Sequence, residues 1–144
     1  MRIALLCGAL VALTACQPKQ LYVDKGYIRL GAVASRPAAA YFTVHGGPTD
    51  ETLINVSSEA AIRTEMHESM QKGSMSSMKA IDHVAVPAGG KLVFAPGGKH
   101  VMLFDVNPSI TPGRTTPLIL TFADGLRIEY DATVIAAGDP APTG

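Results

Sequence analysis

Hydrophobic and polar side chains alternate along several segments of the chain, most clearly near the C-terminus. From Leu126 to Val134 every second residue is apolar, and the residues between them are charged or polar. A period of two places the apolar side chains on one face of a β-strand and the polar ones on the other. The segment therefore predicts a strand with one buried face and one solvated face.

A second predicted strand, residues 118–122, precedes this one across Asp124-Gly125. Both turn residues tolerate positive φ, so an Asp-Gly pair between two β-type segments predicts a hairpin. Further strands are predicted at residues 22–30, 39–44, 52–57, 62–67, 78–86, 91–94 and 100–106. Short strands separated by glycine and proline are typical of an antiparallel sandwich or barrel, and no segment has a helical period. We therefore expect an all-β fold.

The N-terminus resembles the signal of a secreted lipoprotein. Residues 3–12 are almost continuously apolar but too few to span a bilayer, and small residues precede Cys16. We expect residues 1–15 to be removed and Cys16 to carry the lipid. Cys7 leaves with the signal, so the mature chain would have no partner for a disulfide. Gln17, following the lipidated cysteine, favours the outer membrane over the inner one, with the domain in the periplasm.

The mature chain is expected to form one domain. Residues 16–20 form a polar tether, residues 21–135 a single β domain, and residues 136–144 a disordered tail. The whole chain has twelve basic and twelve acidic residues, and loss of Arg2 leaves eleven basic ones. No basic patch points to nucleic acid. Attachment to a membrane is expected through the lipid alone.

Methionine and histidine carry the candidate chemistry. All methionines of the mature chain lie between positions 66 and 102, among them Met78 and Met102, with His67 and His100 in the same window. Thioether sulfur selects Cu(I), and imidazole accompanies it readily. This donor set does not suit zinc, calcium or magnesium, whereas Ag(I) would compete. His100 and Met102 are two apart on a predicted strand, so both side chains can reach one ion.

The other histidines and methionines have simpler interpretations. His45 and His83 are expected to be structural or exposed, and Met66 shares a face with Ile62 and suits the core. Met70 and Met75 fall in the polar connection between two predicted strands. For these two, plain exposure and an auxiliary copper contact both remain open.

The spacing His67, Met78, His100, Met102, with ten, twenty-one and one intervening residues, resembles the copper-binding signature of the periplasmic PCu(A)C copper chaperones. The similarity covers residues 22–134. Further shared landmarks are Tyr27-Ile-Arg29, Ala39-Ala-Tyr-Phe-Thr-Val44, Met66-His-Glu-Ser69, Val86-Pro-Ala-Gly-Gly90, Pro96-Gly-Gly-Lys-His-Val-Met-Leu103 and Leu120-Thr-Phe-Ala-Asp-Gly125.

The resemblance implies a cupredoxin-like Greek-key fold, Cu(I) held by those four residues, and delivery of copper to enzymes such as cytochrome oxidase or its assembly factors. His45 departs from the family, which often has asparagine there, and the lipoprotein cysteine is not general to it. The first departure leaves the ligands untouched, and the second bears on location.

The same residues leave some other functions open and argue against others. Copper or silver sequestration without onward transfer uses the same ligands and stays open, as does a structural lipoprotein without metal. A blue-copper electron carrier needs a thiolate ligand, and the only mature cysteine is the lipid acceptor. No serine–histidine–aspartate arrangement or phosphate-binding loop is present, so we expect no enzyme.

Overall fold

The computed structural model describes residues 18–143, and within this range the chain forms ten β-strands and no helix. The all-β prediction is confirmed. No helix within the described range is long and apolar enough to cross a membrane. The strands are β1 (Tyr22–Arg29), β2 (Ala38–His45), β3 (Glu51–Ser57), β4 (Ala61–Lys72), β5 (Met75–Ala80), β6 (Val84–Val86), β7 (Lys91–Phe94), β8 (Lys99–Val106), β9 (Thr115–Phe122) and β10 (Arg127–Ile135).

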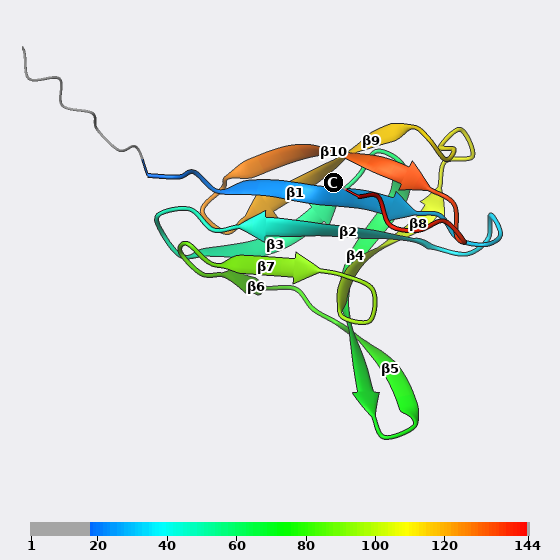
Figure 1. The fold of residues 1–144 in the computed structure, drawn as a ribbon, viewed down its shortest axis with the longest axis horizontal. Coiled ribbons are helices and arrows are strands. Elements are labelled where there is room, and N and C mark those ends of the chain that lie inside the picture. Colours follow the sequence, from blue (N-terminus) through cyan, green and yellow to red (C-terminus); the bar gives the residue numbers. More distant parts are fainter. Residues whose placement is uncertain (1–17, 144) are drawn as a thin grey trace, which may run out of the picture.

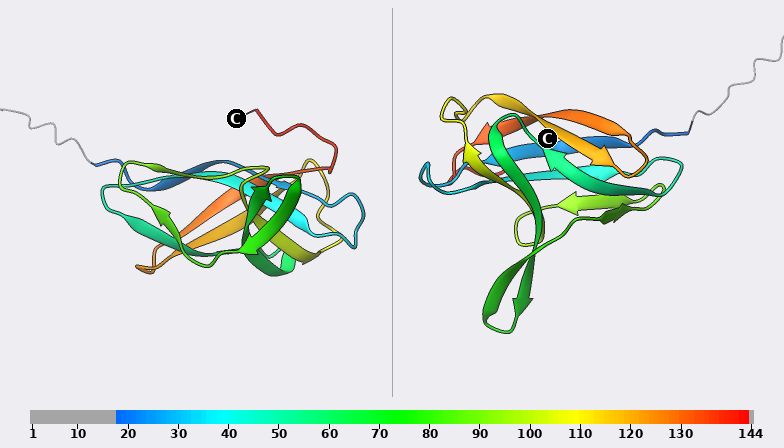
Figure 2. Two further views of the ribbon diagram at one scale, coloured as in Figure 1. Left: turned by 90° about the horizontal axis from the view of Figure 1, so that it is seen from below. Right: turned by 180° about the vertical axis from the view of Figure 1, so that it is seen from behind.

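All ten strands belong to one sheet in the order β5-β4-β8-β7-β2-β1-β10-β9-β3-β6, and β8 also pairs with β2. Most neighbours are antiparallel, whereas β1 with β10 and β7 with β8 are parallel. The sheet rolls into two layers (Figures 1 and 2). The Thr64 hydroxyl of β4 donates to the Val56 carbonyl of β3, which joins distant parts of the strand order.

The core lies between the layers and follows the period of two. Along β2 buried and partly exposed residues alternate without a break, and Phe42 of this strand stacks on Phe94 with ring centroids 4.5 Å apart. Met66 of β4 is only 6% exposed and belongs to the same cluster. Its interpretation as a core residue is therefore confirmed.

The predicted C-terminal hairpin is also confirmed. Strands β9 and β10 pair in register from Thr121 with Arg127 onward. In the turn between them Gly125 has φ 93°, and the Asp124 carboxylate accepts a hydrogen bond from the Leu126 amide at 2.8 Å. The Asp-Gly pair thus supplies the left-handed backbone and the side-chain acceptor that this turn needs.

The strands on either side of the polar connection between His67 and Met78 do pair as a β-hairpin, but most of the connection is itself paired, so the expectation of a loop there was wrong. Strand β4 continues to Lys72, and β5 begins at Met75 after the two-residue turn Gly73-Ser74, in which Gly73 has φ 64°. Glycine at the first position of such a turn suits a type II′ hairpin. The hairpin is held together by backbone pairing and this turn, and neither of its side-chain faces is buried in the core. It projects from the body of the sheet (Figure 1).

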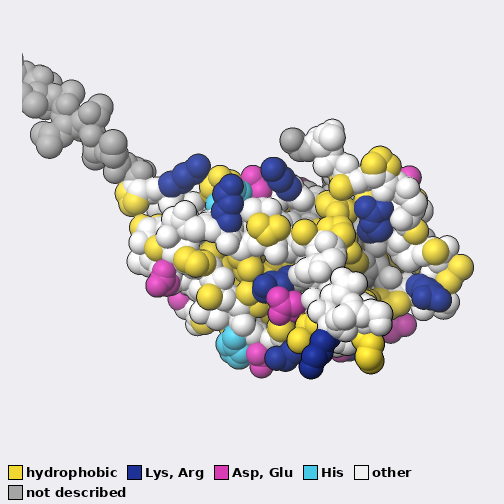
Figure 3. Space-filling view, turned by 60° about the horizontal axis from the view of Figure 1, so that its bottom comes forward, with side chains coloured by type: hydrophobic (Ala, Val, Ile, Leu, Met, Phe, Trp, Pro, Cys, Tyr) yellow, Lys and Arg dark blue, Asp and Glu magenta, His cyan; other side chains and the backbone are white. Residues whose placement is uncertain are grey.

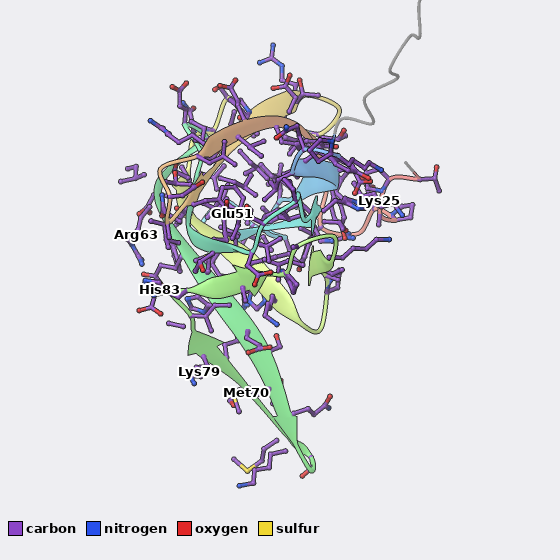
Figure 4. The ribbon with its side chains drawn as sticks, turned by 90° about the vertical axis from the view of Figure 1, so that its left-hand side faces the viewer. Lys25, Glu51, Arg63, Met70, Lys79 and His83 are labelled. Atoms are coloured by element: carbon purple, nitrogen blue, oxygen red, sulfur yellow. The ribbon has the colours of Figure 1, made fainter. Side chains whose placement is uncertain are left out.

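The two ends of the described chain lie away from this hairpin. The chain enters β1 at one side of the body, and the hairpin tip points away from another side (Figures 1 and 4). Near the C-terminus the Arg29 guanidinium donates to the carbonyls of Ala137 and Asp139. Disorder of the tail stays a prediction, and the predicted signal and Cys16 lie outside the described residues.

Candidate metal centre

The pairing of β4 with β8 sets the centre of the candidate site. His67 lies directly opposite His100, and Glu65 lies opposite Met102. Opposite residues present their side chains on the same face of a sheet, as do residues two apart on one strand. His67, His100 and Met102 therefore share one face, and the two imidazole centroids are 5.9 Å apart.

Strand β5 places Met78 on this same face, which we call the ligand face of the hairpin; it bears His67, Ser69, Met78 and Ala80. Met78 lies opposite Ser69, whereas His67 lies opposite Ala80. Met78 is thus a diagonal neighbour of His67, one step nearer the hairpin tip. Met102 lies one step from the histidine pair in the other direction. The structure brings the histidines together and places one methionine on each side of them.

Each histidine ring has one nitrogen with a partner and one without. His100 is 4% exposed, and its Nδ1 lies 3.0 Å from the Gly98 carbonyl. A carbonyl only accepts, so we assign the ring proton to Nδ1. The Nε2 of His100 is buried and has no hydrogen-bond partner. It presents a free lone pair inside the site.

His67 has the same arrangement with its nitrogens exchanged. Its Nε2 lies 2.9 Å from a carboxylate oxygen of Glu65, which assigns the proton to Nε2. Its Nδ1 is buried and has no partner. Buried polar atoms without a partner are rare in folded proteins because they lose their hydration. Metal-binding histidines commonly donate their other N–H to a carboxylate or a backbone carbonyl, as both of these do.

Glu65 is itself held by neighbours on the ligand side of β4. Arg63 forms an ion pair with it, and the Arg63 guanidinium stacks on the ring of Phe104 at 3.9 Å. Sequence reasoning did not single out Glu65 and so missed this contact with His67. The available signal was its position two residues before His67, because alternate residues of a strand share a face.

Other potential donors near the site are restricted. Ala39 of β2 pairs with Met102, and Tyr41 shares the face of Ala39. Burial raises the pKa of the Tyr41 hydroxyl, nearby Tyr27 raises it further, and Arg29 opposes both effects. The phenol therefore stays protonated and offers no phenolate. Within residues 18–143 no three histidine, cysteine, aspartate or glutamate side chains lie together as a metal cluster.

The remaining histidines lie outside this centre. The His45 ring stacks on Tyr22 with centroids 4.3 Å apart, beside a cavity of about 480 Å³, and its side chain is 16% exposed. Its Nε2 is 2.9 Å from Asp24 without hydrogen-bond alignment, so we treat the contact as an ion pair only. His45 is thus more covered than expected. His83 is exposed beside Asp82, whose carboxyl pKa is lowered by a hydrogen bond from His83.

Met70 and Met75 occupy the other side of the hairpin, which we call its reverse face; it bears Glu68, Met70, Lys72, Met75, Ser77 and Lys79. Met70 lies opposite Ser77, and Met75 lies opposite Lys72. These positions alternate with those of Ser69 and Met78, so their side chains point away from the ligand face. The structure therefore separates Met70 and Met75 from the four residues of the predicted signature.

The chain is similar to known proteins in both sequence and fold. Residues 21–134 match the family model described as LpqE-like. The protein named "Putative lipoprotein Lxx21020" from Leifsonia xyli subsp. xyli is 30% identical over 111 residues, which cover 76% of this chain and 66% of that protein. This chain thus spans just under two thirds of the relative's length.

Solved structures with the same fold support the resemblance noted in the sequence. The copper-bound PCuAC domain from PmoF2 superposes with a TM-score of 0.66 at 21% identity, covering 83% of this chain and 96% of that domain. The solution structure of CuI-DR1885 from Deinococcus radiodurans gives 0.62 at 23% identity, covering 85% and 81%. The similarity to PCu(A)C domains is therefore confirmed at the level of the fold.

Proposed function

Because this chain belongs to the LpqE-like family, we propose that it is a lipid-anchored copper carrier that binds Cu(I) outside the cytoplasm and passes it to a copper enzyme. One observation carries the proposal. Two imidazoles on adjacent strands each leave one buried nitrogen without a partner. Such nitrogens are suited to share a metal ion, and Met102 lies on the same face as both.

In this proposal His67 contributes Nδ1 and His100 contributes Nε2, while Met102 and Met78 supply sulfur. All four donors are neutral, and the two sulfurs favour Cu(I) over harder ions. Met78 is 61% exposed on the projecting hairpin. An incoming thiolate or imidazole of an acceptor can replace this ligand first, so transfer proceeds by ligand exchange with copper remaining Cu(I).

The comparisons support copper as the cargo. The titles of the two solved structures describe a copper-bound PCuAC domain and a Cu(I)-loaded protein. The fold that this chain shares with those proteins supports a copper-binding role for the sheet that carries its histidine pair. The Lxx21020 name supports a lipoprotein, for which Cys16 would be the lipidated residue.

Cu(I) affinity tests the binding site. The protein competes for Cu(I) with a chromogenic chelator. We expect the wild type to remove Cu(I) from the chelator, whereas with the His67→Ala/His100→Ala double variant the Cu(I) should stay bound to the chelator. A His45→Ala/His83→Ala double variant is the matched control because both residues lie outside the centre. X-ray absorption of the loaded protein should show sulfur and nitrogen neighbours. Equal affinities of wild type and the His67/His100 variant would refute the site.

Transfer is distinguished from sequestration by a second experiment. The Cu(I)-loaded protein is mixed with the apo copper domain of a cytochrome oxidase, the proposed type of recipient, and copper is followed after separation. The exposure of Met78 favours transfer, so we expect copper on the oxidase domain. Retention of all copper by the carrier would favour a protein that sequesters copper or silver.

A further inference from the structure

The methionines of the hairpin are divided between its two faces. Met78 lies on the ligand face, whereas Met70 and Met75 lie on the reverse face. The pairing is continuous from His67 with Ala80 to Lys72 with Met75, so no irregularity brings the two sets to one side. Met70 and Met75 therefore cannot complete the donor set of His67 and His100 while this pairing holds.

Met70 and Met75 are neighbours of each other. Met70 lies opposite Ser77, and Met75 is two residues from Ser77 on the same strand. Diagonal neighbours of this kind lie about 7–8 Å apart at their Cα atoms, within reach of long side chains. Two thioether sulfurs on flexible side chains can therefore approach one ion from this face.

Packing does not account for these two residues. Met70 is 50% exposed and Met75 is 76% exposed, and every residue of β5 is exposed. Figure 4 shows Met70 and Lys79 on the hairpin, clear of the body of the sheet. Met66, by contrast, is buried in the core. The sulfur atoms of two exposed methionines can reach a metal ion in solution, whereas the sulfur of a core methionine cannot.

We propose that Met70 and Met75 form a second Cu(I) site on the reverse face, a two-sulfur station through which copper enters or leaves the His67/His100 centre. The inference rests on the proposed function, because the station serves that centre. Two thioethers select Cu(I) but hold it less firmly than two imidazoles and two thioethers. No redox step is involved; one set of neutral ligands replaces another.

The charges around the pair suit brief occupation. Lys72 lies opposite Met75, and Lys79 shares the same face. The one carboxylate there, Glu68, is paired with Lys99 at 3.0 Å. A cation on the reverse face is therefore not retained by uncompensated negative charge. Strand β5 is an edge strand of the sheet, so an ion can pass around its open edge from Met75 and Met70 to Met78.

The experiment follows each methionine methyl group separately. The domain is labelled at its methionine methyl carbons, and NMR spectra are recorded while Cu(I) is added under reducing, oxygen-free conditions. We expect Met78 and Met102 to shift with the first equivalent. Met70 and Met75 should shift together with the second equivalent, and buried Met66 serves as the internal control. The same titration is made with His67→Ala/His100→Ala.

The outcomes separate this inference from the proposed function. In the histidine double variant Met70 and Met75 should still shift together, although tight first-site binding is lost. The second site is overturned if they do not shift, or if they shift at unrelated concentrations. It is also overturned if they shift with the first equivalent and stop responding in the double variant. A response of Met70 and Met75 alone in wild type supports the second site and refutes the histidine centre.

Discussion

The body of the sheet and the projecting hairpin share one strand, β4, but differ in what stabilises them. Up to Met66 the strand contributes to the core, whereas from His67 it pairs with β5 and, after Glu68, no longer pairs with β8 of the body. His67 lies at this boundary. The contrast shows that burial stabilises the fold in one region, while the other region is free to carry exposed donors.

Methionine shows the same contrast within one residue type. Met66 is 6% exposed and fills the core, whereas Met75 is 76% exposed at the hairpin turn. On the face drawn in Figure 3, positive and negative side chains are interspersed. The hairpin itself carries only three charged residues, Glu68, Lys72 and Lys79, so the sulfur and imidazole donors are its distinctive chemistry.

The largest predicted effect compares stability in the two regions. Phe42→Ala should lower the free energy of unfolding by about 3–5 kcal/mol, because it leaves a cavity against Phe94. Met75→Ala should change it by less than about 0.5 kcal/mol, because the side chain is exposed. Chemical denaturation measures both. Similar losses would mean that the hairpin is stabilised by the same packing as the body.

The next effect concerns the boundary between the regions. His100→Ala should weaken Cu(I) binding by more than about 100-fold. Removing a residue that only hydrogen-bonds to a metal ligand typically costs up to about 100-fold, and loss of a ligand should cost more. Competition with a chelator measures the change, and His45→Ala is the control on the same protein body. A loss no larger than that of the control would remove His100 from the ligands.

The positioning role of Glu65 should be smaller but measurable. Glu65→Ala removes the acceptor at His67 Nε2 and should weaken Cu(I) binding by about 10–100-fold. Glu65→Gln keeps an oxygen acceptor there and should restore part of the affinity. Glu68→Ala, on the reverse face, is the matched control. If Gln and Ala at position 65 behave alike, the hydrogen bond does not position the ring.

The smallest effect is expected within the hairpin. Met78→Leu keeps the size of the side chain but removes the sulfur, and we expect a loss on the order of tenfold, or about 1.4 kcal/mol. X-ray absorption should then show one sulfur fewer around the first copper ion. Met75→Leu should leave that first shell unchanged. An unchanged sulfur count in Met78→Leu would exclude Met78 as a ligand.

Much of the body could be predicted from sequence, whereas the extent of the hairpin strands could not. Strands such as residues 126–134 have one buried face, so apolar and polar residues alternate along their sequence. The segment from His67 to Met78 buries no face, so its strands leave no such pattern. The register that sets His67 opposite His100 depends on two strands distant in sequence. The free ring nitrogens follow from that register and from Glu65 and Gly98, which spacing alone does not reveal.

The short stretch before β1 has a spatial consequence for the proposed carrier. Six residue steps separate Cys16 from Tyr22, where β1 begins. A fully extended chain of this length reaches at most about 20 Å. With the lipid in a bilayer, this tether would keep the start of β1 within about 20 Å of the membrane surface. The hairpin with its methionines would then stay close to the membrane, and an acceptor would have to present its copper ligands near the membrane as well.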